Sequence, residues 1–284
     1  MDFYKQCLYV VATPIGNLAD FSPRAVDILK RVDRIAVEDT RHSARLLQHF
    51  AIQTPMQALH EHNERKLADA FLQKIEQGQT LALISDAGTP LLSDPGYHLV
   101  RLAREKGIRV IPIPGACAIT TALSAAGLPT DRFRFEGFLP AKSGARQQQL
   151  EELKQETVTL VFYESPHRIE DTLADMQAIL GEQRQAVLAR ELTKTFETIR
   201  GDTLAALSAW VAGDANQRKG EIVLLVQGAE ALNPEDLNPE AERVLKILLQ
   251  ELPMKQAASL AAEITGVRKK KLYARGVVLK QSGG

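Results

Sequence analysis

The chain has 284 residues, of which 45% are hydrophobic, and its 35 lysines and arginines balance its 35 aspartates and glutamates. A chain of this size can bury a sizeable core and is longer than one typical domain, so we expect at least two domains. It contains no apolar run of the roughly 18 residues that a membrane span needs, and its start lacks the regions of a secretory signal, so we expect a cytoplasmic protein that binds no membrane.

Residues 1–122 predict an N-terminal domain in which strands and helices alternate. CLYVVATP (7–14) predicts a buried strand because its apolar run is short, β-branched and ended by a proline, and Ser22 with Pro23 predicts the start of the next helix. The alternation continues, with strands expected at 34–39, 56–60, 80–86 and 108–115 and helices at 43–50, 64–78, 96–107 and 116–127. Such an alternation indicates an α/β fold with a mostly parallel sheet covered on both faces.

Residues 123–230 predict a second α/β domain with a different pattern. Strands are expected at 133–140, 157–165, 185–191, 195–201 and 220–228, and helices at 167–181 and 203–211. Only three residues separate the strands at 185–191 and 195–201, so these two form a hairpin and the sheet is mixed. Residues 231–240 then predict a linker, because L-N-P-E is repeated there, and residues 241–284 a small helical domain.

Unusual residues follow each strand expected in the first domain. They are ATPIGN (12–17), EDTRHS (38–43), HEHNE (60–64), DAGTPLLSDPG (86–96) and PGACAITT (114–121). Each loop alone could equally be a tight turn, but ligands of open α/β sheets bind beyond the carboxyl ends of the strands, where all five lie. The chain contains no G-x-G and no phosphate-binding loop, and residues 86–96 contain no lysine or arginine. We therefore expect a ligand with hydroxyls, an amine or a positive centre, such as a sulfonium nucleoside.

The ordered motifs resemble those of the tetrapyrrole-methylase superfamily of S-adenosylmethionine enzymes. The motifs are ATPIGN, EDTR, HNE, SDAGTPLLSDPG, FYESPHR, ARELTKTFE and RKGEIVLLVQG, and they span about residues 8–228. Within the superfamily they are most similar to bacterial enzymes that methylate a ribose 2′-hydroxyl of small-subunit ribosomal RNA. The resemblance implies two α/β domains, S-adenosyl-L-methionine bound folded in the cleft between them, a homodimer, and a cytidine in the decoding region of the RNA as substrate.

The resemblance also implies which residues bind the methyl donor. These are Pro14, Asp86, Gly88, Leu91, Ser93, Asp94, Ala118, Thr120, Phe162, Tyr163, Leu192, Gly220 and Ile222. Leu192 and Ile222 would fit equally well in a plain core. Asp86 and Gly88, which follow a buried strand, are harder to explain as structural residues.

Methyl transfer from a sulfonium needs mainly positioning, which is worth up to about 7–11 kcal/mol, together with an acceptor for the hydroxyl proton. The candidates in the motif loops are Asp39, Arg41, Asn63, Glu64, Glu191 and Lys194. Lys194 can act as a base only if its pKa falls well below about 10.4, and it could equally be an exposed turn lysine, while Arg41 could instead hold a phosphate. We expect no metal site, because His60 and His62 have no further ligands clustered with them. We expect Cys7 and Cys117 to be small core residues.

The last 44 residues carry nine basic and three acidic residues, a net charge of +6 that leaves −6 on the remainder. Two helices around a turn at Thr265 and Gly266, the first with apolar Ala257, Ala258, Leu260, Ala261 and Ile264, predict a bundle of helix-turn-helix type. Four consecutive basic residues, Arg268, Lys269, Lys270 and Lys271, favour contact with RNA phosphates, although a solvated helix face would look the same. Lys142 and Arg146 lie in a second basic stretch, which we expect to be flexible and to bind RNA.

Three functions stay open at this point. The first is methylation of the small-subunit ribosomal RNA, free or within the 30S subunit. The second is a related methyltransferase for a tetrapyrrole or another small molecule, which would not need the basic tail. The third is a helix-turn-helix nucleic-acid-binding protein that senses a small ligand.

Overall fold

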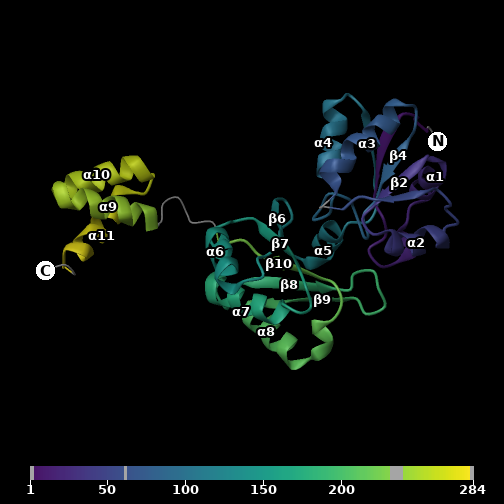
Figure 1. Cartoon of the computed structure of the whole chain (residues 1–284). Coiled ribbons are helices and arrows are strands. Elements are labelled where there is room, and N and C mark those ends of the chain that lie inside the picture. The colour runs from purple at the N-terminus through teal and green to yellow at the C-terminus, as the bar shows by residue number, and fades with distance from the viewer. Residues whose placement is uncertain (1–2, 61–62, 231–238, 282–284) are drawn as a thin grey trace. The chain divides into compact units, whose positions relative to one another are not determined.

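Residues 3–60, 63–230 and 239–281 are described by a computed structural model (Figure 1). Most of the predicted linker, residues 231–238, lies outside these ranges, as does His62. The chain divides into two compact units, Met1–Gly228 and Ala229–Gly284. Among the described residues, none of the helices has the length and apolar character that crossing a membrane requires.

The first sheet consists of five parallel strands. They are β1 (Cys7–Val11), β2 (Arg34–Val37), β3 (Met56–Ala58), β4 (Leu81–Leu83) and β5 (Arg109–Ile113). The strands pair in the order β3-β2-β4-β1-β5, and every pair is parallel, which confirms the predicted sheet. Because the strands run in one direction, the loops that follow them gather at one edge of the sheet.

Helices cover both faces of this sheet (Figure 1). They are α1 (Pro23–Arg31), α2 (Thr40–His49), α3 (Glu64–Glu76) and α4 (Tyr97–Glu105), with a short 3₁₀ helix η1 (Leu18–Asp20) before α1. Neighbouring residues of a strand point to opposite faces, so Tyr9 packs in one core with residues of α1 and α2, and Leu8 packs in a second core with residues of α3 and α4. The predicted start of α1 is confirmed, since the Ser22 hydroxyl accepts a hydrogen bond from the backbone N–H of Ala25 at 3.1 Å.

The second sheet is mixed, as predicted. Its strands are β6 (Phe133–Phe138), β7 (Thr159–Glu164), β8 (Gln185–Arg190), β9 (Thr198–Thr203) and β10 (Ile222–Val226). They pair in the order β6-β7-β10-β8-β9. Strands β6 and β7 are parallel and the other pairs antiparallel, including the predicted hairpin of β8 and β9.

Each face of the second sheet has a different cover. The helices are α5 (Ala118–Ala126), α6 (Ser143–Leu153), α7 (Ile169–Leu180) and α8 (Leu204–Gly213), with a 3₁₀ helix η2 (Ala215–Arg218) after α8. Helices α6, α7 and α8 form a core with one face, and α5 packs against the other (Figure 1). Both sheets thus belong to one unit. The predicted domain boundary between residues 122 and 123 falls inside α5 and stays a prediction.

The second unit is a bundle of three helices, α9 (Pro239–Glu251), α10 (Met254–Thr265) and α11 (Lys269–Gln281). Helix α9 begins inside the predicted linker, and the predicted turn is confirmed, because Gly266 ends α10 in the left-handed conformation at φ 73°. Ala257, Ala258 and Ala261 are buried in its core, whereas Leu260 and Ile264 are 41% and 62% exposed. The sequence predicted that all five of these apolar residues share one face of α10. The structure confirms this for the three alanines, whereas the side chains of Leu260 and Ile264 are exposed to solvent.

Candidate functional site

A cavity of about 370 Å³ lies beyond the carboxyl end of the first sheet, where the loops after β1, β4 and β5 face strands β7 and β10. We call it the apolar cavity, because most of the residues on its wall are apolar. Eight of the residues predicted to bind the donor line it: Gly88, Ser93, Asp94, Ala118, Tyr163, Leu192, Gly220 and Ile222. Among the described residues, those that line this cavity include no lysine or arginine, which suits a ligand without phosphates.

The other five predicted residues are not on this wall. Pro14 is buried in the loop after β1, and Asp86 and Leu91 are partly exposed in the loop after β4. The Thr120 hydroxyl donates to the Cys117 carbonyl at 3.2 Å, within α5. The Phe162 ring lies in the core under α6, α7 and α8, because its strand turns Tyr163, and not Phe162, toward the cavity.

The loops after β1 and β4 are bonded to each other. The N–H of Thr13 donates to the carbonyl of Gly88 at 2.9 Å, and the N–H of Gly88 donates back at 3.1 Å. Gly88 has φ +82°, and a Cβ there would lie 3.2 Å from Cγ2 of Ile15, so a larger residue would be both strained and crowded. Leu91 and Ser93 adopt φ 75° and 66°, which costs non-glycine residues on the order of 1–3 kcal/mol each. Strained backbone of this kind is concentrated at ligand sites.

The loop after β8 closes the opposite side of the cavity. Glu191 and Thr193 also have positive φ, at 52° and 66°. The Thr193 hydroxyl accepts a hydrogen bond from the N–H of Asn17 at 3.1 Å, and a Cβ on Gly16 would overlap the side chain of Lys194. A glycine at residue 16 therefore permits the loop after β1 to touch the loop after β8.

Acidic groups surround the loop after β4. Burial, reinforced by the nearby carboxylate of Glu38, raises the pKa of Asp94 to about 7. The pKa of Glu38 is raised in turn, mainly by its own burial and then by Asp86. The carboxylate of Asp86 accepts a hydrogen bond from the N–H of Asp39 at 3.3 Å. A positively charged ligand would favour the ionised form of this cluster.

A second cavity, of about 570 Å³, adjoins the first. Ser93 and Asp94 line both cavities. We call the second one the polar cavity, because Glu38, Glu64 and His98 are also on its wall. Two compartments that share part of one wall suit a reaction between two different molecules.

Three of the predicted catalytic residues lie at the starts of helices. Asp39 is the N-cap of α2 and accepts from the N–H of Arg41 at 2.7 Å, which lowers the pKa of this carboxyl. The Arg41 side chain is exposed. Asn63 holds its own loop, since its side-chain oxygen accepts from the N–H of His60 at 2.9 Å. The hydrogen bonds of Asp39 and Asn63 to nearby backbone groups give both residues a structural role, and their catalytic role stays a prediction.

Lys194 does not meet the condition for a general base. Burial alone would lower its pKa, but its ammonium group pairs with Glu191 at 2.7 Å and with Glu221 at 2.8 Å, and these two carboxylates raise the pKa instead. Glu221 lines the apolar cavity. Lys194 thus holds the loop after β8 in place through Glu191 and Glu221, and its role as a base stays a prediction that the raised pKa does not favour.

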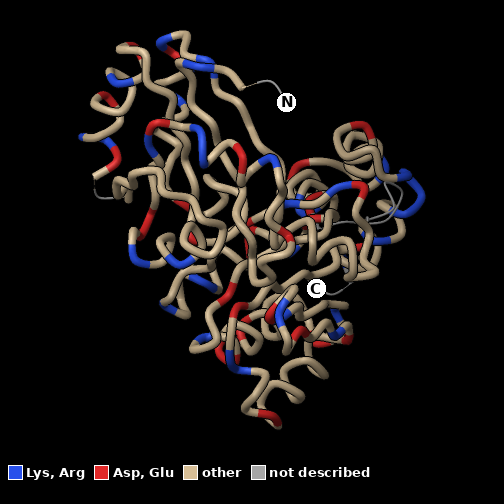
Figure 2. The backbone as a smooth tube through the Cα atoms, turned by 90° about the vertical axis from the view of Figure 1, so that its right-hand side faces the viewer, with Lys and Arg blue, Asp and Glu red and all other residues tan. Residues whose placement is uncertain are grey.

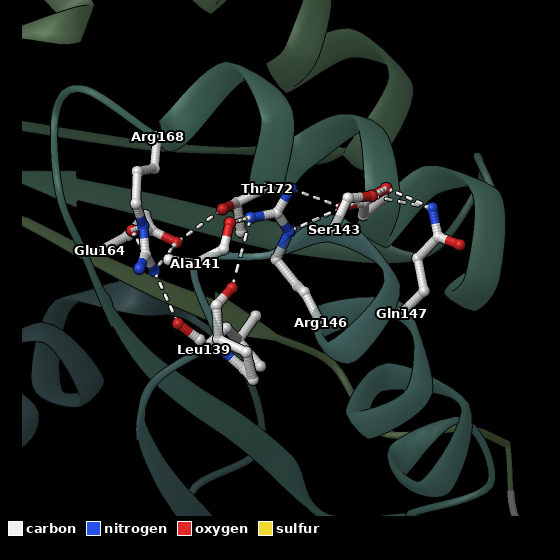
Figure 3. A network of polar contacts seen from close by, with 10 residues as sticks. Leu139, Ala141, Ser143, Arg146, Gln147, Glu164, Arg168 and Thr172 are labelled. Atoms are coloured by element: carbon white, nitrogen blue, oxygen red, sulfur yellow. Dashed lines mark hydrogen bonds and ion pairs between the residues drawn. The ribbon is translucent and has the colours of Figure 1, made fainter.

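Arg146 is buried and not available to RNA. It is 2% exposed on α6, and its Nε donates to Asp175 at 2.6 Å while its Nη1 donates to the carbonyl of Ala141 at 3.3 Å (Figure 3). The stretch predicted to be flexible is helical from Ser143 onward, and a helix turns Arg146 toward α7. This corrects the RNA-binding role, whereas Lys142 is exposed, as that role requires.

A second pair, between the partly buried Arg168 and the buried Glu164, supports the same loop. Arg168 Nε donates to the carboxylate of Glu164 at 2.9 Å, and its Nη2 donates to the carbonyl of Leu139 at 2.8 Å (Figure 3). Thr172 also donates to Glu164, at 2.6 Å. The backbone just before Lys142 is thus held from α6 and from the residue that precedes α7.

The four predicted RNA-binding residues of the second unit, Arg268 to Lys271, are exposed at the start of α11. Lysines and arginines elsewhere are spread along the chain together with acids (Figure 2). Other basic residues of this unit are paired internally, since Arg275 and Lys246 both bind Glu242 and lower the pKa of that carboxyl to about 2. The start of α11 therefore exposes the run of four basic side chains that the sequence predicted to contact RNA, and that contact stays a prediction.

Several wall residues of the apolar cavity were missed by the sequence analysis. These are Ile15, Ala87, Thr89, Leu92, Cys117, Phe138, Glu164, Ser165, Pro166, Glu221 and Val223. Most lie inside the motifs quoted above, so their position beside predicted residues was the available signal. Cys117 was expected in a core but is only half-buried, while Cys7 is fully buried as predicted.

Two family models match the chain. Residues 7–208 match the Tetrapyrrole (Corrin/Porphyrin) Methylases, and residues 235–280 match the RsmI C-terminal HTH domain. A protein of Pseudomonas aeruginosa named Ribosomal RNA small subunit methyltransferase I is 60% identical, covering 94% of this chain and 95% of its own length. A protein of the same name from Escherichia coli O157:H7 is 59% identical, covering 94% and 93%. The crystal structure of the methyltransferase CobJ has a TM-score of 0.58 at 17% identity, covering 80% of this chain and 96% of that one, which shows a shared fold.

Proposed function

The chain belongs to the tetrapyrrole methylase family, and from this premise we propose that it methylates the ribose 2′-hydroxyl of a cytidine in small-subunit ribosomal RNA. Its relatives at 59–60% identity are named as methyltransferases of that RNA, and the chain is accordingly an S-adenosyl-L-methionine-dependent ribosomal RNA methyltransferase. The cytidine and the 2′-oxygen are the parts of this statement that are proposed.

The apolar cavity fits the methyl donor. Its volume lies within the roughly 300–1,000 Å³ of small-molecule sites, and its apolar wall suits a nucleoside. Gly88 and Gly220 leave room for close contact, and Tyr163, Leu192 and Ile222 supply apolar surface. When bound, S-adenosyl-L-methionine supplies a methyl group on a positively charged sulfur. The carboxyl groups of Asp94 and Glu221 lie on the wall and can balance the positive charge of that sulfur.

Asp94 is the residue that we propose as the proton acceptor. It lies on the wall common to both cavities, where a hydroxyl presented from the polar cavity would meet it. A base whose pKa is about 7 is half ionised at neutral pH, which is the range in which general bases act best. The loops bonded through Thr13 and Thr193 hold the site in shape.

The second unit supplies affinity for RNA in this proposal. Exposed lysines at the start of α11, together with Lys142, suit phosphate contacts that are strong but insensitive to sequence. We further propose that the acceptor is the 30S subunit or its RNA, that the protein is a homodimer, and that it acts in the cytoplasm. The match of residues 235–280 to the RsmI C-terminal HTH domain favours RNA over a tetrapyrrole substrate, and the donor-sized cavity favours an enzyme over a ligand sensor.

The proposal is tested by incubating the protein with methyl-labelled donor and, separately, 30S subunits, free ribosomal RNA, duplex DNA or a precorrin. We expect label in the RNA of the 30S subunits or in the free RNA, and nuclease digestion with mass spectrometry should locate it on the ribose of one cytidine. Label on a base, on another nucleotide or only on the precorrin would contradict the proposal.

A further inference from the structure

The polar cavity contains a buried carboxylate that is only half satisfied. Glu64 is 4% exposed, and its Oε1 accepts a hydrogen bond from the N–H of Leu99 at 3.0 Å. Leu99 is in the first turn of α4, so this oxygen takes the place of a cap for that helix. Among the described residues, no donor bonds to the other oxygen of Glu64, and this oxygen is not one of the fully buried polar atoms that lack a partner, so it is open to the polar cavity.

A carboxylate oxygen that faces a cavity can accept a hydrogen bond from a molecule bound there. Because Glu64 lines the polar cavity, a ligand in that cavity can donate one. Glu38 and Asp94 line the same cavity, and its wall also carries Arg65, so three carboxyl groups face one guanidinium. Beside Glu64 the wall therefore favours a molecule that presents an N–H or O–H donor.

Tyr97 provides a flat surface beside these acceptors. Its ring lines the polar cavity, is 57% exposed, and meets His98 edge-on with 5.5 Å between the ring centroids. An exposed aromatic ring is the usual platform for an unstacked base of RNA. A platform and a row of acceptors together match a nucleobase with an exocyclic amino group.

We propose that the polar cavity binds the base of the nucleotide to be methylated, with Glu64 accepting a hydrogen bond from the cytosine amino group and Tyr97 stacking on the ring. The inference rests on the proposed function. Carboxylates recognise cytosine through its N4 amino group, whereas uracil presents the O4 carbonyl at the same position. Because the two cavities share Ser93 and Asp94, a base held there brings its ribose toward the donor.

The test exchanges the acceptor at Glu64 for a donor. In Glu64→Gln the amide oxygen can still accept from the N–H of Leu99, and the amide NH₂ then faces the cavity. We would measure kcat/KM for 30S particles that carry either the methylated cytidine, mapped with the wild-type protein, or a uridine at that position. Asp69→Asn, on the same helix but outside both cavities, is the matched control.

We expect the wild type and Asp69→Asn to prefer cytidine by about tenfold or more, which is the scale of one specific base contact. Glu64→Gln should lower this ratio by about tenfold while the Kd of the donor is unchanged. A folded Glu64→Gln protein with the wild-type ratio would overturn the proposal. So would a weakened donor Kd with an unchanged ratio, which would assign Glu64 to the donor.

Tyr97 tests the proposal without disturbing the buried carboxylate. Tyr97→Ala should raise KM for the particles by about tenfold, and Tyr97→Phe should restore it, because stacking needs only the ring. An Ala variant with wild-type KM would overturn the stacking role. If the wild type methylates no cytidine ribose at all, the proposed function fails first, and the inference falls with it.

Discussion

Replacing Asp94 with asparagine tests the proposed proton acceptor, because the change keeps the shape of the side chain and removes the ionisable group. Asp94 is neutral below a pH of about 7 and ionised above it. The wild-type kcat/KM for the donor, which reports the free enzyme, should therefore rise with pH and level off above about 7. At pH 6 about one tenth of the molecules carry the ionised form, so kcat/KM should be about one tenth of its plateau.

The variant should lose both the rate and the pH dependence. Loss of a general base lowers turnover by about 10²–10⁴-fold, and the remaining activity of Asp94→Asn should be flat between pH 6 and 8.5. The assay is transfer of labelled methyl groups to 30S subunits, with donor and acceptor both held below their KM so that the rate reports the free enzyme. Asp131→Asn, on the exposed surface, is the control and should keep the wild-type profile.

The same variant has an independent readout in stability. The folded protein holds the Asp94 proton more tightly than the unfolded chain, so the folded state loses stability as pH rises from about 4 to about 7. The full shift from 3.8 to about 7 corresponds to about 4 kcal/mol, which we discount to about 2 kcal/mol because the side chain is partly exposed. Asp94→Asn should thus be more stable than the wild type at pH 8, with no such gain at pH 4.

A pH–rate profile of Asp94→Asn that is the same as that of the wild type would refute the assignment of Asp94 as the proton acceptor.

Three further changes have defined outcomes. Gly88→Val should abolish donor binding measured by calorimetry, since the position has φ +82° and a crowded Cβ; binding as tight as that of the wild type would place the donor elsewhere. Arg146→Met should lower the free energy of unfolding, measured by chemical denaturation, by about 3–5 kcal/mol, because it leaves the Asp175 carboxylate buried without its counter-charge. Lys142→Ala should instead leave the free energy of unfolding unchanged and weaken RNA binding. The reverse pattern would contradict these assignments. Ending the chain at Gly228 should preserve donor binding and reduce both RNA affinity and its salt dependence; RNA binding that is unaltered at every salt concentration would show that the second unit is not needed.

The amino-acid sequence by itself determined the architecture, because its local patterns carry that information. Short β-branched runs that alternate with amphipathic helices specify the parallel sheet. The short connection between two strands, predicted as three residues and observed as residues 191–197, specifies the hairpin of β8 and β9. Gly266 specified the turn of the second unit. Since parallel strands align their carboxyl ends, the order of strands and loops was also enough to predict that the loops after them meet at one edge, whereas the resemblance implied that Gly88 and Ala118 bind the donor there.

Only the tertiary structure decided what individual polar side chains do. Arg146 and Lys142 lie in one basic stretch, yet one is bonded to Asp175 and the other is exposed, because the helical turn at α6 decides which faces α7. The pKa of Lys194 depends on Glu221, which lies 27 residues away, and the free oxygen of Glu64 depends on how α3 meets α4. Burial, pairing and ionisation are properties of such long-range contacts, and the local sequence pattern does not contain them.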